Sequence, residues 1–365
     1  MATCLHTTPQ PSVCEACARR QVRRRAGIRN LAVAGGVVAV VAGLVVFLQT
    51  RPSKAPPPPK VESDPLETFK TERLASAPCE YKAAEDLVIF YAQREKWQKA
   101  ADVGYRYVSN CPDPNPMREY LEYVYKQIGQ WRAALDQDNL LIAAEPTASD
   151  YWWWRGDSYA QGDQDDVAMV DFRQSLALNS YWNARGVAAS GILSAADKLK
   201  LPCEADRAWS WFVRHNDGRR SQEAYNLHAY LQRGHACDAE RGVGVGKLAI
   251  DKKLSAIVGT VKGELVVDVK AGTTVISTDY AKRAGIVALS KNVATTEWSG
   301  VMLEGYPARA SKITVGKFSA TNVEVLISDD LEPGDDGVLG FSFLWHFDWS
   351  DNYDQTLTLR ALVND

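Results

Sequence analysis

A repeat with a period of 34 residues runs through the middle of this chain and constrains its fold more than any other feature. Between about residues 80 and 180, residues of one type recur at this spacing, namely Tyr91, Tyr125 and Tyr159; Ala100, Ala134 and Ala168; Trp97 and Trp131; Pro112 and Pro146. A unit of this length cannot bury its apolar face alone, so consecutive units must stack against one another. The sequence therefore predicts a stacked array in this region.

The repeated residue types resemble those of tetratricopeptide repeats, in which small residues let paired helices pack closely and proline ends each unit. The resemblance implies an all-α array over residues 75–240, with a more divergent part after about residue 180. Such arrays usually present a groove to a peptide or protein ligand, which is the partner that we expect. The alternative is that the array only spaces or dimerises the domain that follows it.

Residues 248–365 differ in character, because alternating apolar runs are separated there by Gly- and Asp-rich turns, which predicts β-strands. One apolar run ends in residues 268–271, Asp-Val-Lys-Ala, and a Thr- and Ser-rich stretch follows it. This pattern resembles the active-site strand and turn of retropepsin-like aspartic peptidases, which carry Asp-Thr-Gly-Ala. Residues 279–286 and 337–344 are similar to two later landmarks of that family and follow in the expected order. The resemblance implies an all-β retropepsin-like barrel.

In that family each chain supplies one half of the active site. The resemblance makes Asp268 the catalytic residue, one per subunit, and implies a homodimer in which two such carboxyl groups share one proton. The pair would activate water as general base, protonate the leaving group as general acid, and hydrolyse peptide bonds without a cofactor. Residues 295–308 contain two glycines and stand where the family has its substrate-covering flap.

Val269 and Lys270 replace the Thr and Gly of the family motif. Val269 cannot make the hydrogen bond that the threonine makes across the two-fold axis, and a nearby Lys270 ammonium would favour the ionised carboxylate over the shared-proton state. We therefore expect an impaired or inactive peptidase, a pseudoenzyme that acts in peptide or protein binding. The alternative is an active dimeric aspartic endopeptidase acting on envelope proteins, which a solvent-facing Lys270 would favour.

Residues 31–48 form an uncharged apolar run, long enough as a helix to cross most of a ~30 Å hydrocarbon core. A basic segment, residues 19–30, precedes the run, and a Pro-rich linker, residues 49–74, follows it. Because basic residues favour the cytoplasmic side, we expect a single-pass anchor in a bacterial inner membrane, with the N-terminus cytoplasmic and residues after about 49 periplasmic. A cleaved signal peptide is the alternative.

Residues 1–18 contain Cys4, His6, Cys14 and Cys17. Four such ligands, two of them in a Cys-x-x-Cys pair, suit a tetrahedral structural zinc site, and a reducing cytoplasm would keep the thiols available. We therefore expect a cytoplasmic zinc-binding head. The alternative is a tail whose cysteines are incidental.

The other cysteines, Cys79, Cys111, Cys203 and Cys237, flank two predicted helical hairpins. In such a hairpin the start of the first helix and the end of the second lie together, which favours the disulfides Cys79–Cys111 and Cys203–Cys237. These bonds would persist in an oxidising compartment such as the periplasm. Four buried free thiols are the alternative.

The formal net charge of −3 gives no reason to expect a nucleic acid partner. The sequence as a whole predicts a multidomain α+β protein. Its expected parts are one transmembrane helix, an all-α tetratricopeptide-like array and a C-terminal all-β retropepsin-like barrel.

Overall fold

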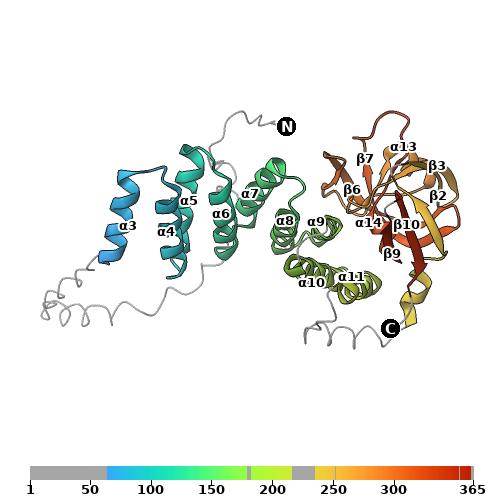
Figure 1. The fold of residues 1–365 in the computed structure, drawn as a ribbon, viewed down its shortest axis with the longest axis horizontal. Coiled ribbons are helices and arrows are strands. Elements are labelled where there is room, and N and C mark those ends of the chain that lie inside the picture. The colour runs from blue at the N-terminus through green and yellow to red at the C-terminus, as the bar shows by residue number, and fades with distance from the viewer. Residues whose placement is uncertain (1–63, 179–181, 216–234, 251, 353, 363–365) are drawn as a thin grey trace, which may run out of the picture. The chain divides into compact units, whose positions relative to one another are not determined.

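The computed structural model describes residues 64–178, 182–215, 235–250, 252–352 and 354–362 (Figure 1). All of these residues belong to one compact unit. Helices make up its first part and strands most of its second part. The expected zinc-binding head, the basic segment and most of the Pro-rich linker lie outside the described residues.

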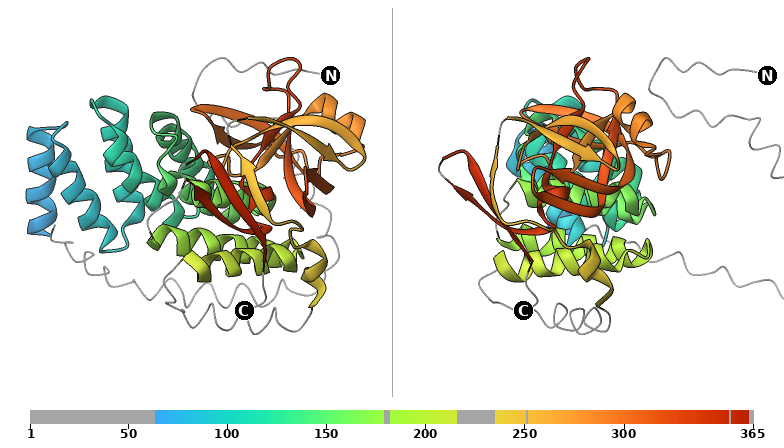
Figure 2. Two further views of the ribbon diagram at one scale, coloured as in Figure 1. Left: turned by 45° about the vertical axis from the view of Figure 1, so that its right-hand side comes forward. Right: turned by 90° about the vertical axis from the view of Figure 1, so that its right-hand side faces the viewer.

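Successive helices of the first part pack against one another in chain order, as Figures 1 and 2 show. Their bounds are α3 Pro65–Ser76, α4 Tyr81–Ala92, α5 Trp97–Asn110, α6 Asn115–Gln127, α7 Trp131–Ala144, α8 Ser149–Gln161, α9 Asp165–Ala177, α10 Trp182–Lys198 and α11 Pro202–His215. Helices α4, α6 and α8 begin 34 residues apart, and so do α5, α7 and α9. The sequence period is therefore the length of one helix pair.

The alanine column of the repeat lies inside the stack. Ala100, Ala134 and Ala168 stand at equivalent positions near the starts of α5, α7 and α9, and all three are fully buried. A side chain of one methyl group lets neighbouring helix backbones approach closely. The repeated small residues thus mark helix packing, as the resemblance to tetratricopeptide repeats implies.

Helix α3 begins at Pro65, inside the stretch expected to be linker. The Asp64 side chain accepts a hydrogen bond from the Leu66 backbone N–H at 2.9 Å, and proline occupies the first helical position. Aspartate at the N-cap and proline just after it are favourable at a helix start. These local signals favour a helix although the preceding residues are proline-rich.

The second part is a β domain with two sheets. Its elements are η1 His235–Glu240, β1 Gly246–Ala249, β2 Lys253–Val258, β3 Val261–Val267, β4 Thr274–Ser277, α13 Thr278–Ala284, β5 Ala294–Trp298, β6 Val301–Val315, β7 Phe318–Ser328, β8 Gly337–Leu339, α14 Phe341–Leu344, β9 Phe347–Asn352 and β10 Thr356–Ala361. The larger sheet has the order β2-β3-β8-β4-β7-β6-β5, with β2 also pairing with β6, which closes the strands around an apolar core. The smaller sheet has the order β1-β10-β9.

Strand β8 lies between two strands that are much earlier in the sequence. It runs parallel to β3, with Leu339 opposite Val267, and antiparallel to β4, with Val338 opposite Val275. A Cβ atom on Gly337 would lie 2.1 Å from the Val275 carbonyl oxygen, so only glycine fits where β8 enters. This insertion brings the end of β3 and the start of α14 together.

One part of the expected fold class is corrected. Among the residues that the structure describes, no helix is long and apolar enough to cross a membrane. The longest described helix, α10, has 17 residues, whereas a membrane span needs about 20 apolar ones. The described fold is a helical array followed by a β-barrel, without a transmembrane helix, and residues 31–48 lie outside it.

Candidate active site

Asp268 lies directly after β3, in the turn that the inserted β8 holds in place. Its backbone N–H donates to the Leu339 carbonyl at 3.1 Å, and its Oδ1 accepts from the Lys270 backbone N–H at 2.8 Å. The side chain is half-buried. A carboxylate that accepts from the backbone two residues on is fixed in orientation within the turn.

The two substituted motif residues have different surroundings. Val269 is half-buried and packs against the core of the barrel, so its side chain contributes packing and no hydrogen bond. Lys270 is exposed. The Lys270 backbone, in contrast, makes hydrogen bonds on both sides of its Cα, because its N–H binds Asp268 and its carbonyl accepts from the array.

A network of buried hydrogen bonds connects the elements next to the turn. The Thr274 N–H donates to Ser342 Oγ at 2.8 Å, and Thr274 Oγ1 accepts from the Gly340 N–H at 3.1 Å. Ser342 Oγ in turn donates to the Glu324 carbonyl at 2.8 Å. These contacts tie β4, β7 and the start of α14 together behind Asp268.

Strands β5 and β6 form a hairpin where the sequence predicts a flap. Its two-residue turn, Ser299-Gly300, has φ values of 51° and 84°, a conformation that suits a tight hairpin. Glu297 Oε1 accepts from the Gly300 N–H, while Glu297 Oε2 is buried without a partner among the described residues. Burial raises the pKa of Glu297, and the negative charge of Asp268 raises it further. A second buried carboxyl group thus lies within electrostatic range of Asp268.

Helix α9 of the array enters the space between the turn and this hairpin. Gln174 is completely buried, and its Nε2 donates to the Lys270 carbonyl at 2.8 Å. Its Oε1 accepts from the Gly272 N–H at 2.8 Å and the Glu297 N–H at 3.1 Å, and the Thr296 hydroxyl lies 2.6 Å away. One side chain therefore bridges the turn after Asp268 and the hairpin.

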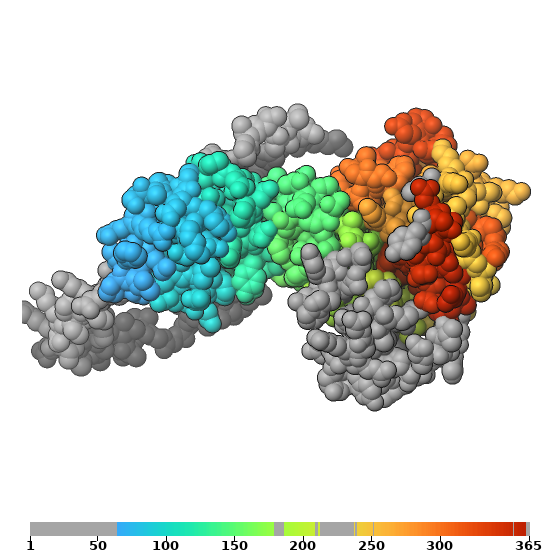
Figure 3. All heavy atoms as spheres, viewed as in Figure 1, coloured from blue at the N-terminus to red at the C-terminus, as the bar shows by residue number. Residues whose placement is uncertain are grey.

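Apolar packing between α9 and the barrel accompanies these hydrogen bonds. The shared cluster contains two residues of α9 together with residues of the turn and of strands β4 to β8, namely Val167, Val170, Ala271, Val275, Ala294, Leu303, Leu326 and Val338. The backbones also approach closely, because a Cβ atom on Gly272 would lie 2.4 Å from Gln174 Cα. In Figure 3 green atoms of the array abut the orange atoms near β5.

The family comparison covers this site. Residues 255–343 match the model of the aspartyl protease family, and the match includes the Asp268 turn, the hairpin and β8. The C-terminal domain is thus similar to the aspartyl proteases, in agreement with the retropepsin-like pattern of its sequence. Among proteins of curated function, none is significantly similar in sequence to this chain.

Solved structures are similar to each part of the chain. A retropepsin-like aspartic protease from Rickettsia conorii is 22% identical, with a TM-score of 0.24, over 33% of this chain and 96% of its own. A tetratricopeptide repeat protein from Parabacteroides merdae is 20% identical, with a TM-score of 0.38, over 47% of this chain and 67% of its own. A tetratricopeptide protein of Thermus thermophilus is 17% identical, with a TM-score of 0.35, over 46% of this chain and 87% of its own.

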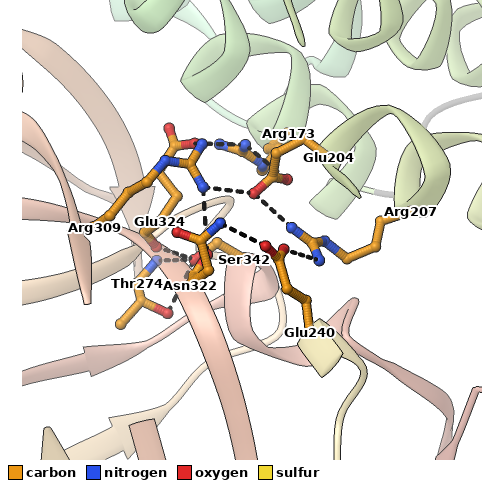
Figure 4. A network of polar contacts seen from close by, with 9 residues as sticks. All are labelled: Arg173, Glu204, Arg207, Glu240, Thr274, Arg309, Asn322, Glu324 and Ser342. Carbon is orange, nitrogen blue, oxygen red and sulfur yellow. Dashed lines mark hydrogen bonds and ion pairs between the residues drawn. The ribbon is translucent and has the colours of Figure 1, made fainter. Parts of the chain in front are cut away.

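A charged network fixes the array to the retropepsin-like domain (Figure 4). Arg173, next to Gln174 in α9, lies 2.6 Å from Glu324 of β7 and 3.3 Å from Glu204 of α11. Arg207 and Arg309 also pair with Glu204. Burial alone would raise the pKa of Glu204, but these three arginines hold it well below its ordinary value. Glu204 therefore stays ionised inside the contact.

Two disulfides are present where the sequence favours them. Cys79 is bonded to Cys111 at the N-terminal end of the array, and Cys203 at the start of α11 is bonded to Cys237 in η1. Because η1 is the first element of the β domain, the second bond joins the end of the array to the start of that domain.

The expected zinc cofactor is corrected. Within the described ranges, no group of three or more His, Cys, Asp or Glu side chains could hold a metal ion. The residues expected to bind zinc, Cys4, His6, Cys14 and Cys17, lie outside these ranges. The expectation rested on the number and spacing of three cysteines and one histidine in that segment. The described cysteines, Cys79, Cys111, Cys203 and Cys237, are bonded in pairs.

The sequence patterns did not indicate Gln174, Thr296 or Glu297 as site residues. A usable signal existed in α9, whose sequence carries apolar residues on every side, whereas a helix with one exposed face carries them in one stripe. That composition indicates burial on more than one face. It does not indicate which surface covers the second face.

Proposed function

We propose that the retropepsin-like domain binds an extended peptide or protein segment and that its hydrolytic activity is impaired. The observation that carries this proposal is the pair of backbone groups beside Asp268: the Lys270 carbonyl and the Gly272 N–H both point into the space beneath the hairpin. An acceptor and a donor two residues apart are what an added strand uses for its main-chain hydrogen bonds. Binding needs only these two backbone groups and the hairpin that would cover the bound strand.

Hydrolysis needs more than binding, because the reaction uses two carboxyl groups that share one proton. The turn of one chain provides only Asp268. Glu297 is nearby, but its Oε1 is held by the hairpin turn. Val269 packs into the core and offers no hydroxyl for a contact across a dimer axis. These features support an impaired site.

The second candidate function is an active aspartic endopeptidase formed by two chains. It is favoured by the exposure of Lys270, because water screens the charge of an exposed ammonium, and by the backbone N–H that orients Asp268. This form requires Asp268 of a second copy, so the site must open towards that copy.

The deciding experiment incubates the full-length protein with a randomised decapeptide library from acidic to neutral pH and measures both cleavage and retained peptides. Retention without cleavage supports the proposed function. Cleavage that is lost in Asp268→Asn, which keeps the side-chain shape, supports the endopeptidase instead. Cleavage gained only by the double variant Val269→Thr, Lys270→Gly would identify those two residues as the cause of the impairment. If peptides are neither retained nor cleaved, both candidate functions are contradicted.

For the array and its surroundings we propose two further points. Its helix pairs recruit a peptide or protein to the neighbouring retropepsin-like domain, as arrays of this kind commonly bind such ligands. The described part of the chain works in an oxidising compartment such as the bacterial periplasm, which the two disulfides support.

A further inference from the structure

Helix α9 is buried on nearly every side, which is unusual for a helix in an open stack. Its buried residues include charged and polar ones, such as Asp171, Arg173 and Gln174. One side packs on α8 and α10 within the array, and the other contacts β5, β6 and α14 of the retropepsin-like domain. The helix therefore lies against the turn and the hairpin of the retropepsin-like domain.

The carboxamide of Gln174 makes the contacts that the backbone N–H and C=O of one residue in a bound strand would make. In a ladder, a strand residue donates its N–H to one backbone carbonyl and accepts from an N–H further along its neighbour. Gln174 donates to the Lys270 carbonyl and accepts from the Gly272 N–H. It also accepts from the Glu297 N–H of the hairpin, which would cover a bound strand.

Val170 supplies the apolar part of the same interaction. It lies four residues before Gln174, so both side chains are on one face of α9. Val170 is completely buried in the cluster that contains Ala271 of the turn and Val338 of β8. A strand that replaced α9 would place a side chain of similar size in this position.

Docking of α9 and addition of a strand exclude each other. A neighbouring strand lies about 4.8 Å from the backbone to which it bonds. The Gln174 backbone already occupies this space, because a Cβ atom built on Gly272 would come within 2.5 Å of the Gln174 nitrogen. A peptide can therefore occupy the site only when α9 has moved away from the turn.

We propose that α9 is a built-in competitor for the peptide site, with the Gln174 carboxamide in the place of the backbone N–H and C=O of one ligand residue and Val170 in the place of a small apolar ligand side chain. The inference rests on the proposed function. The ligand class is an extended peptide with a small aliphatic residue beside a free backbone amide. Because only the undocked fraction of the protein can bind, the apparent association constant is the intrinsic one multiplied by that fraction.

The test measures two quantities on the full-length protein: affinity for the tightest-retained decapeptide of the library, and hydrogen exchange of the Gly272 and Glu297 amides. The variant is Gln174→Ala, and the matched control is Gln161→Ala, whose exposed amide donates to Asp157 in its own helix. We expect Gln174→Ala to bind about tenfold more tightly and both amides to exchange at least about tenfold faster. The control should match the wild type.

A second variant, Gln174→Glu, keeps the side-chain size but removes the N–H that the Lys270 carbonyl accepts, so it should change both quantities in the same direction. If both variants bind the peptide as tightly as the wild type although their amides exchange faster, α9 does not compete with the peptide, and the proposed binding function stands. Unchanged exchange shows that Gln174 does not hold the turn and also overturns it. If no library peptide is retained by any of these proteins, the proposed function fails, and the competitor fails with it.

Discussion

Arg173 Nη2 lies 2.6 Å from Glu324 Oε2, and this pair joins the helical array to the sheet that carries the candidate site. Both side chains are almost completely buried. Burying charges is costly unless each charge is paired, and here Glu204 and Arg309 complete the pairing. The contact therefore sets how firmly α9 stays docked.

Replacing Arg173 by alanine should destabilise the protein by about 3–5 kcal/mol, because Glu324 and Glu204 would each lose a buried partner. Urea unfolding measures the change. The control is Arg73→Ala, which breaks ion pairs at a partly exposed position and should have little effect. A small loss for Arg173→Ala would show that the network does not hold the two parts together.

Gly272→Ala should separate α9 from the turn. The new methyl group would lie 2.4 Å from Gln174 Cα, so the helix must move, at a cost of about 2–3 kcal/mol. The comparison is Gly316→Ala, where a methyl group meets nothing within 4 Å but φ is +57°, which should cost about 1 kcal/mol through backbone strain alone. Faster exchange of the Glu297 amide only in Gly272→Ala would identify helix displacement. If both variants lose the same stability and the Glu297 amide exchanges no faster in either, the prediction is contradicted.

The buried His346 should make the protein less stable in acid. Burial lowers the pKa of His346 to about 3, and the adjacent Arg207 acts in the same direction. Its Nδ1–H donates to the Glu240 carbonyl at 2.6 Å. In the unfolded chain the ring takes up a proton near its ordinary pKa of about 6.5, whereas the folded protein keeps it neutral. The free energy of unfolding should therefore fall as the pH drops from about 6.5 to about 3, by up to about 1.4 kcal/mol per pH unit.

Carboxyl groups titrate in the same range, so the contribution of His346 is obtained as a difference. The variant His346→Asn keeps a side-chain donor but does not titrate. Chemical unfolding at several pH values should give a shallower slope for the variant in this window, by about the uptake of one proton. Identical slopes would mean that the ring is protonated in the folded protein.

Breaking Cys203–Cys237 should loosen the entry to the retropepsin-like domain. The bond joins residues 34 apart, and a loop of this length corresponds to about 3–4 kcal/mol of stabilisation. The double variant Cys203→Ser, Cys237→Ser should therefore unfold at a lower temperature. The matched control is Cys79→Ser, Cys111→Ser, which should lower the unfolding temperature without faster exchange of the Gly272 amide. Thiols are titrated on protein from an oxidising compartment. If Cys79, Cys111, Cys203 and Cys237 all react, both disulfides are contradicted.

Much of the local architecture follows from the sequence. The 34-residue period predicts helix pairs, because a repeated unit must bury the same face each time, and helices α4 to α9 begin at that spacing. The residues around Asp268 predict a strand that ends in a turn, and β3 ends at Val267. The two-residue turn of the β5–β6 hairpin lies within the predicted flap. These features depend on contacts between neighbours in the chain or on a local pattern.

The sequence by itself determined the order of the parts, the helix period and the position of Asp268, because each is encoded in residues close together in the chain. Only the tertiary structure decided what covers the candidate site. Gln174 and Gly272 are almost one hundred residues apart, and their contact depends on how the array docks, through Arg173 and Glu324, on the barrel. No periodicity or motif specifies such a contact, because its free energy comes from the fit of two finished surfaces.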